Sequence, residues 1–184
     1  MNSVEPIRDL STLKDMQDYF KVKNKRNYVL FNVGIYSPMR ISDILTLKVR
    51  DVRGKYIRRR EKKTNKENKV IINNELRKIL DDYIEDMNDY DYLFLSRQRN
   101  RYGVYSHITR QQVDNILKDA AREFHLEAIG CHSMRKTFGY HYYQRTKDLE
   151  ILRKIFNHSN TGVTAAYIGI TQKMKDNAIE TFKY

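Results

Sequence analysis

The feature that most constrains the fold is a nearly unbroken apolar segment at residues 28–35. A helix that is apolar on every side is stable only when it is buried. The segment ends at Ser37-Pro38, where the proline disfavours a helical conformation at the residue before it. We therefore predict a buried helix that ends just before Arg40, followed by a short helix that begins near Ser42 and Asp43.

Helical periodicity recurs along most of the chain, and only 2 Pro and 7 Gly interrupt it. The expected helices cover residues 10–20, 74–84, 109–120, 133–143, 149–155, 161–167 and 171–182. Between residues 49 and 72, turns at 52–55 and 63–68 separate three expected strands, of which the second covers 56–60 and the third 69–72. The prediction is a mainly α (α+β) single domain over residues 1–184, with a small three-stranded antiparallel sheet.

The charge of the chain narrows its partners. It carries 35 basic and 23 acidic residues, a net charge of +12. Such a surface attracts polyanions, with nucleic acid as the first candidate and an anionic membrane surface as the second. Apolar runs fall short of a membrane span, and no signal peptide opens the chain. Because Cys131 is the single cysteine, an internal disulfide is excluded, and we expect a cytoplasmic protein.

Several polar residues have the chemistry of a phosphate site. His132 and Arg135 lie three residues apart, so a helix places both on one face. A guanidinium binds two phosphate oxygens and an imidazole can transfer a proton near neutral pH. Arg40, held between two apolar helices, could add a second guanidinium. Each of these residues taken alone fits an ordinary solvated or paired side chain as well.

Two further pieces complete the pattern. Lys63 lies in a predicted turn, where a lysine ordinarily keeps the turn solvated or contacts DNA, and can also donate a proton. His158 and Tyr167 would face opposite ways on one continuous helix. The Asn160-Thr161-Gly162 sequence should break such a helix, so we expect the chain to bend and bring the two side chains together.

In this order, the pieces resemble the tyrosine recombinase (phage integrase) family, from about Arg8 to the end of the chain. The stretches that carry the resemblance are residues 39–47, 63–66, 132–138 and 157–159, with Tyr167. The six matching site positions are Arg40, Lys63, His132, Arg135, His158 and Tyr167. The resemblance implies a helical catalytic domain that needs no metal or other cofactor.

The resemblance also implies a role for each site residue. Tyr167 would attack the scissile phosphate and form a 3′-phosphotyrosyl intermediate, while Lys63 would protonate the leaving oxygen and His132 would assist proton transfer. Arg40 and Arg135 would hold the non-bridging oxygens.

His158 would bond to the same phosphate. We expect further contacts with double-stranded DNA from the basic strand and turn, at Arg58, Arg59, Arg60, Lys62 and Lys66.

Three departures from the family pattern stand beside site residues: Ser37-Pro38-Met39 replaces a common Gly-Leu, Asn157 replaces Gly, and Ile155-Phe156 replaces a more typical Leu. Few residues precede Arg40, so we expect a catalytic domain that lacks the N-terminal core-binding domain clamping DNA in most members. Residues Met174, Ala178 and Phe182 could form a helical face that packs on a second copy or folds back on the chain itself.

Three functions fit these observations. The first is a site-specific recombinase or integrase of a mobile element, encoded by a bacterium or phage. The second is a DNA-binding regulator or accessory factor with the same fold and little catalysis. The third is a type IB topoisomerase-like swivelase. The complete set of six site residues favours the two enzymes over the regulator, and the apolar face of the last helix favours the recombinase.

Overall fold

A computed structural model of the chain describes residues 4–60, 67–99, 102–170, 176 and 179–182, with only the backbone given for 59, 60, 67 and 68. Helix α2 (Lys25–Tyr36) lies inside the molecule, and its residues 29–35 are all buried. The predicted buried helix is therefore confirmed. Helix α1 (Leu10–Lys23) packs beside it, and Asn24 both ends α1 and caps α2 through its side chain.

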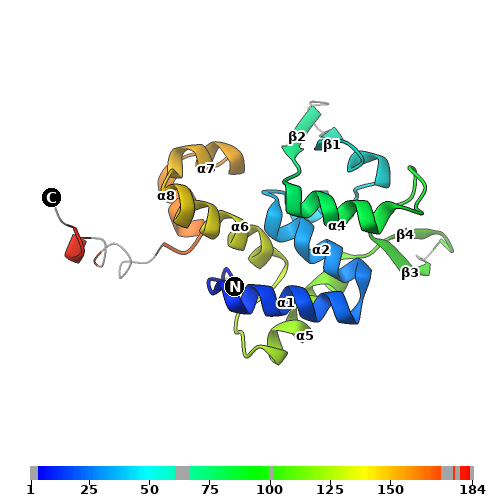
Figure 1. Cartoon of the computed structure of the whole chain (residues 1–184), viewed down its shortest axis with the longest axis horizontal. Coiled ribbons are helices and arrows are strands. Elements are labelled where there is room, and N and C mark those ends of the chain that lie inside the picture. The colour runs from blue at the N-terminus through cyan, green and yellow to red at the C-terminus, as the bar shows by residue number, and fades with distance from the viewer. Residues whose placement is uncertain (1–3, 61–66, 100–101, 171–175, 177–178, 183–184) are drawn as a thin grey trace.

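The other helices are α3 (Ile41–Leu45), α4 (Asn74–Ile84), α5 (Arg110–Glu123), α6 (Cys131–Thr146), α7 (Leu149–Phe156) and α8 (Thr161–Tyr167). Of these, α3, α4 and α6 pack against α2, whereas α7 and α8 lie beyond α6 (Figure 1). The N-caps are Asn73 for α4, Thr109 for α5 and Asn160 for α8. The sequence therefore located these helices to within a few residues. None of the described helices has the length and apolarity needed to cross a bilayer.

The predicted three-stranded sheet is wrong in detail. Strands β1 (Tyr56–Arg60) and β2 (Glu67–Ile71) pair as an antiparallel hairpin, and residues 49–51 before them form the 3-10 helix η1 (Val49–Asp51). A second hairpin pairs β3 (Leu95–Arg99) with β4 (Tyr105–His107). Asp51 explains the error at η1, because its carboxylate accepts a hydrogen bond from the Lys48 amide and closes a tight turn.

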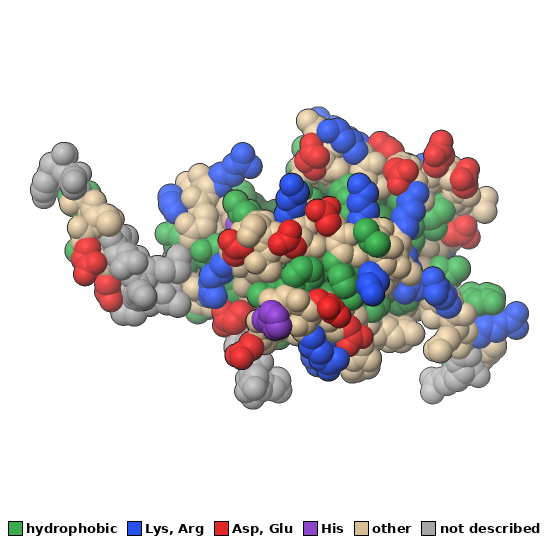
Figure 2. Space-filling model, turned by 60° about the horizontal axis from the view of Figure 1, so that its bottom comes forward, with side chains coloured by type: hydrophobic (Ala, Val, Ile, Leu, Met, Phe, Trp, Pro, Cys, Tyr) green, Lys and Arg blue, Asp and Glu red, His purple; other side chains and the backbone are tan. Residues whose placement is uncertain are grey.

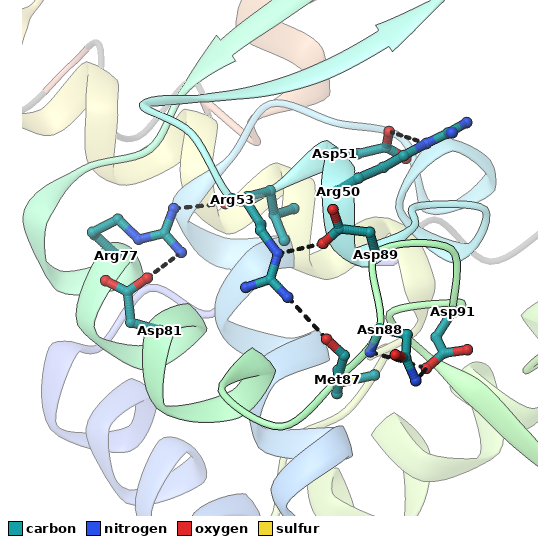
Figure 3. A network of polar contacts seen from close by, with 10 residues as sticks. Arg50, Asp51, Arg53, Arg77, Asp81, Met87, Asn88, Asp89 and Asp91 are labelled. Carbon is teal, nitrogen blue, oxygen red and sulfur yellow. Dashed lines mark hydrogen bonds and ion pairs between the residues drawn. The ribbon is translucent and has the colours of Figure 1, made fainter.

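A polar network fixes the base of the β1–β2 hairpin (Figure 3). Arg53 forms an ion pair with Asp89 and donates to the Met87 carbonyl at 2.8 Å. Arg77 of α4 donates to the Val52 carbonyl at 2.6 Å and pairs with Asp81 at 2.7 Å. The turn before β1 is thus tied both to α4 and to the loop that follows α4.

The apolar interior has two parts of unequal size. The main core lies among α1 to α6 and includes Phe20, Phe31, Leu76, Leu117 and Met134. The C-terminal cluster is small: Leu152, Phe156 and Ile168 are buried in it, with half-buried Phe138, Tyr142 and Tyr167 packed around them. Helix α6 contributes side chains to both parts.

Two glycines let α6 approach its neighbours. A Cβ at Gly34 of α2 would lie 2.5 Å from Met134 Sδ, and a Cβ at Gly139 of α6 would lie 2.7 Å from both Phe156 and Ile168. Neither position therefore has room for a side chain. The close contact at Gly139 brings the C-terminal cluster against α6.

Residues 4–8, which we call the N-terminal segment, lie along α6. The Ile7 amide donates to Thr137 Oγ1 at 2.9 Å, and Lys136 Nζ donates to the Val4 carbonyl at 2.8 Å. Arg8 reaches the end of α8, where its Nη2 lies 3.5 Å from the Gly169 carbonyl. The segment thus joins α6 to the chain just after Tyr167.

Candidate active site

Arg40 stands at the junction between α2 and α3. The Ser37 hydroxyl donates to the Val33 carbonyl at 2.6 Å at the end of α2, and extended backbone then leads to Arg40, the residue before α3. Met39 and Ile41 on either side are buried, while Arg40 is exposed. Two buried neighbours therefore fix the backbone of a side chain that faces solvent.

His132 and Arg135 lie in the first turn of α6, which begins two residues earlier than predicted. Asp114 of α5 accepts a hydrogen bond from the Cys131 amide at 3.1 Å and secures this end of the helix. His132 is half-buried and Arg135 is buried. Arg135 Nη2 donates to the Phe156 carbonyl at 3.1 Å, and its guanidinium carbon lies 4.5 Å from the centre of the Phe156 ring.

His158 follows a sharp turn at the end of α7. Asn157 ends that helix in the left-handed conformation, with φ of 54° and ψ of 48°. Asn adopts this conformation more readily than most residues, which explains how it can stand where the family commonly has Gly. His158 is held at both ends: its carbonyl accepts from Arg153 at 3.0 Å, and its Nδ1 lies 3.1 Å from Thr164 Oγ1.

Tyr167 is the last residue of α8. The chain bends between α7 and α8, so the rings of His158 and Tyr167 lie 5.2 Å apart, and the predicted convergence is confirmed. Arg135 and Lys136 lie over the Tyr167 ring, at 5.8 and 5.4 Å from its centre. The phenol oxygen is buried and has no hydrogen-bond partner within the described part of the chain.

The charges of the two arginines act on the other site residues. Burial lowers the pKa of His132, and the charges of Arg110, Arg135, Lys136 and Arg40 lower it further. Burial also lowers the pKa of His158, with the Arg135 and Arg40 charges in the same direction. Both imidazoles are therefore held towards their neutral form while no anion is bound.

Tyr167 responds in the opposite sense. Burial raises the pKa of its phenol, and the charges of Arg135 and Arg40 offset part of this effect. Burial lowers the pKa of Arg135, and the nearby Arg40 charge adds to that. The charges of two guanidinium groups thus act on one buried phenol, and an anion bound beside them would be stabilised.

The structure brings five of the six predicted site residues together and leaves one untested. The sixth, Lys63, lies outside the described residues, as do Lys62 and Lys66. Arg58 lies exposed on β1, whereas the side chains of Arg59 and Arg60 are not described. Met174 and Ala178 of the expected C-terminal helical face are likewise outside the described part.

Sequence reasoning missed three residues that shape the site. Thr164 binds His158, Arg153 holds the His158 backbone, and Lys136 covers Tyr167. Thr164 could have been found, because a residue three positions before Tyr167 on a helix shares its face. Among the described residues, no three His, Cys, Asp or Glu side chains gather as a metal site would require.

The chain is similar in sequence to known proteins. The phage integrase family model matches residues 8–174. A probable integrase/recombinase of Bacillus subtilis strain 168, YoeC, is 43% identical over 99% of this chain and 98% of its own length.

Two crystal structures share the fold. XerA recombinase superposes with a TM-score of 0.76 at 21% identity, and XerH bound to its difH substrate with 0.68 at 18%. This chain is covered to 98% and 99% in these matches, but it spans only 67% of the XerA chain and 56% of the XerH chain.

Proposed function

The chain belongs to the phage integrase family, and from that premise we propose that it is a site-specific DNA recombinase that acts through Tyr167. The observation that carries the proposal is that His158, Arg135 and the charge of Arg40 converge on this phenol, with His132 beside the same two arginines. These residues come from the α2–α3 junction, from α6 and from the end of α7, and a basic surface alone would not require them to meet. The substrate in this proposal is double-stranded DNA; the Tn1549 transposon integrase, which shares the fold, was solved in complex with DNA.

The arginines bind the scissile phosphate. A guanidinium donates two parallel hydrogen bonds to phosphate oxygens, and its charge stabilises the additional negative charge that develops on phosphorus during attack. Arg135 is already fixed by the Phe156 carbonyl, so little side-chain freedom is lost when it binds. His158, oriented by Thr164, bonds to the same phosphate.

Tyr167 forms the covalent intermediate. Its oxygen attacks phosphorus, the bond to the 5′ oxygen breaks, and a 3′-phosphotyrosyl bond remains. Because burial raises the pKa of the phenol, its proton must pass to a base as the new bond forms, and His132 takes this part. Lys63 donates a proton to the leaving 5′ oxygen. Attack by a 5′-hydroxyl on the phosphotyrosyl bond reverses these steps and rejoins a strand.

Covalent trapping tests the proposal. The protein is incubated with nicked duplexes that cover the DNA around its own gene, and adducts are separated in SDS. We expect an adduct for the natural chain and for Tyr143→Phe, and none for Tyr167→Phe. Tyr143 is a matched control because it is also a half-buried tyrosine of the C-terminal cluster.

The other outcomes select between functions. Absence of an adduct with duplexes that the protein binds specifically would favour the regulator. Relaxation of a supercoiled plasmid of any sequence would favour the swivelase. An adduct that persists in Tyr167→Phe would overturn the site assignment.

Two further predictions belong to the same proposal. We propose that residues 8–174, which the family model matches, act as a catalytic domain, and that the segment after Tyr167 contacts a neighbouring copy on DNA. Sedimentation of the protein with and without its DNA site tests the contact between copies. We expect a monomer without DNA and an assembly of several copies on DNA.

A further inference from the structure

The β3–β4 hairpin is a basic arm that the proposed site does not use. The sequence contains no Asp or Glu between Asp91 and Asp114, and four arginines lie in that interval: Arg97, Arg99, Arg101 and Arg110. Acid-free intervals of similar length also occur at residues 19–42, 128–147 and 151–175, so the hairpin is distinguished by its exposed position as well as by its charge. An acid-free stretch of this kind has no local carboxylates to neutralise its charge.

The hairpin also stands apart from the body of the protein. In Figure 1 it extends at the end of the molecule opposite α7 and α8. Arg97 and Arg99 are exposed, as are Tyr102 and Tyr105, whose exposed fractions are 73% and 52%. Figure 2 shows basic and hydrophobic side chains gathered at this end of the molecule. These side chains therefore contribute little to the packed interior and are accessible to a binding partner.

The base of the hairpin is fixed, so the arm has a defined direction. Arg26 of α2 donates to the Leu95 carbonyl at 2.8 Å, and the Tyr92 and His107 rings pack edge to face at 5.4 Å. Along the arm, the Arg99 guanidinium lies 5.1 Å from the centre of the Tyr105 ring, which supports it without neutralising it.

The chain passes from the arm into α5, whose first turn lies near His132. β4 ends at His107, two residues before the cap of α5, and the Arg110 charge in the first turn of α5 acts on His132. A five-residue strand spans about 17 Å. DNA whose phosphate lies beside His132 can therefore continue towards the arm.

We propose, on the basis of the recombinase function above, that the β3–β4 hairpin binds the backbone of duplex DNA beside the cleavage position through Arg97 and Arg99. Charge complementarity selects this partner, since exposed arginines without neighbouring acids match successive phosphates. The interaction fixes the duplex at a second point, away from the bond that breaks.

The salt dependence of DNA binding tests the proposal. Fluorescence anisotropy with a labelled duplex compares the natural chain, Arg97→Gln/Arg99→Gln, and the control Lys21→Gln/Arg122→Gln, which removes the same charge from exposed positions on α1 and α5. Each lost phosphate contact lowers the slope of log K against log salt by about 0.9, so the hairpin variant should lose about 1.8. We expect its affinity to fall roughly tenfold at low salt, with the control nearly unchanged.

Other results would overturn the inference without touching the proposed function. Equal slopes for the hairpin variant and the natural chain would exclude a phosphate contact. If the hairpin variant kept the slope of the natural chain but formed a protein–DNA assembly of lower mass, the arm would contact a second protein copy and not the DNA. Failure of the natural chain to bind any duplex, by contrast, would count against the recombinase itself.

Discussion

The main core and the C-terminal cluster hold different halves of the site. In the main core, buried neighbours surround α2 and the start of α6, and these elements position Arg40 and His132. Among the described residues, the buried apolar side chains of the C-terminal cluster are Leu152, Phe156 and Ile168, and this small group carries His158 and Tyr167. Arg40 and His132 thus rest on the larger interior, and the proposed nucleophile Tyr167 rests on the smaller one.

This difference indicates which part of the site can open locally. Elements with few buried contacts open more easily than a central core, without unfolding of the whole domain. The two halves meet at α6, through the hydrogen bond from Arg135 to the Phe156 carbonyl and the close packing at Gly139. The position of Tyr167 relative to the arginines therefore depends on these two contacts of α6, which we call the joint.

Breaking this joint should have the largest effect. Arg135→Lys keeps a positive charge but loses the planar fork that serves both the Phe156 carbonyl and a phosphate. We expect adduct formation to slow by about 10²–10³-fold, as for other lost transition-state donors. The measurement is the single-turnover rate of covalent trapping.

Arg153→Lys is the matched control, because Arg153 also donates to a backbone carbonyl, that of His158. We expect it to slow trapping by less than about tenfold, because it loses no phosphate donor. Equal losses in the two variants would show that the fork of Arg135 has no special part in joining the halves.

Core truncation compares the two interiors directly. Leu76→Ala removes a fully buried side chain from the main core and should lower the free energy of unfolding by about 2–5 kcal/mol. Leu152→Ala, also fully buried, should cost less, because the C-terminal cluster can open by itself. Urea denaturation measures both.

Hydrogen exchange locates the change: Leu152→Ala should speed exchange in α7 and α8 and leave α2 unaltered. Faster exchange throughout the chain would mean that the two interiors unfold as one unit.

The smallest effect concerns pH. His132 and His158 both have a folded-state pKa below the ordinary 6.5, so the unfolded chain binds protons first as the pH falls. Their contribution to stability is complete above about pH 6.5 and is lost below it. His132→Asn and His158→Asn should each reduce the fall in Tm between neutral and mildly acidic pH. An undiminished fall in both variants would assign it to other groups.

Local pattern explains most of what the sequence predicted. The helix over residues 28–35 was predictable because its burial follows from its own apolar residues. The bend before α8 was predictable in outline, but it lies earlier than the sequence at residues 160–162 suggested: the chain turns at Asn157, Asn160 caps α8, and Gly162 lies inside that helix. The start of η1 was not predictable, since it depends on one hydrogen bond from the Lys48 amide to the Asp51 carboxylate.

The site divides in the same way. Arg40, His132, Arg135, His158 and Tyr167 could be named from their order in the chain, and the fold brings them together. Of the partners that orient them, Thr164 could be inferred from its helical spacing to Tyr167, but the backbone carbonyls could not. Any residue has a carbonyl, so the sequence around Phe156 gives no sign that Arg135 will bind there.

The N-terminal segment has a consequence for how the protein is made. Residues 4–8 leave the ribosome early, yet their partners Thr137, His141 and Gly169 are synthesised at the far end of the chain. At 5–20 residues per second, these partners follow by roughly 7–30 seconds. The surroundings of Tyr167 therefore close only after the chain has been synthesised to about Gly169, long after the N-terminal segment itself.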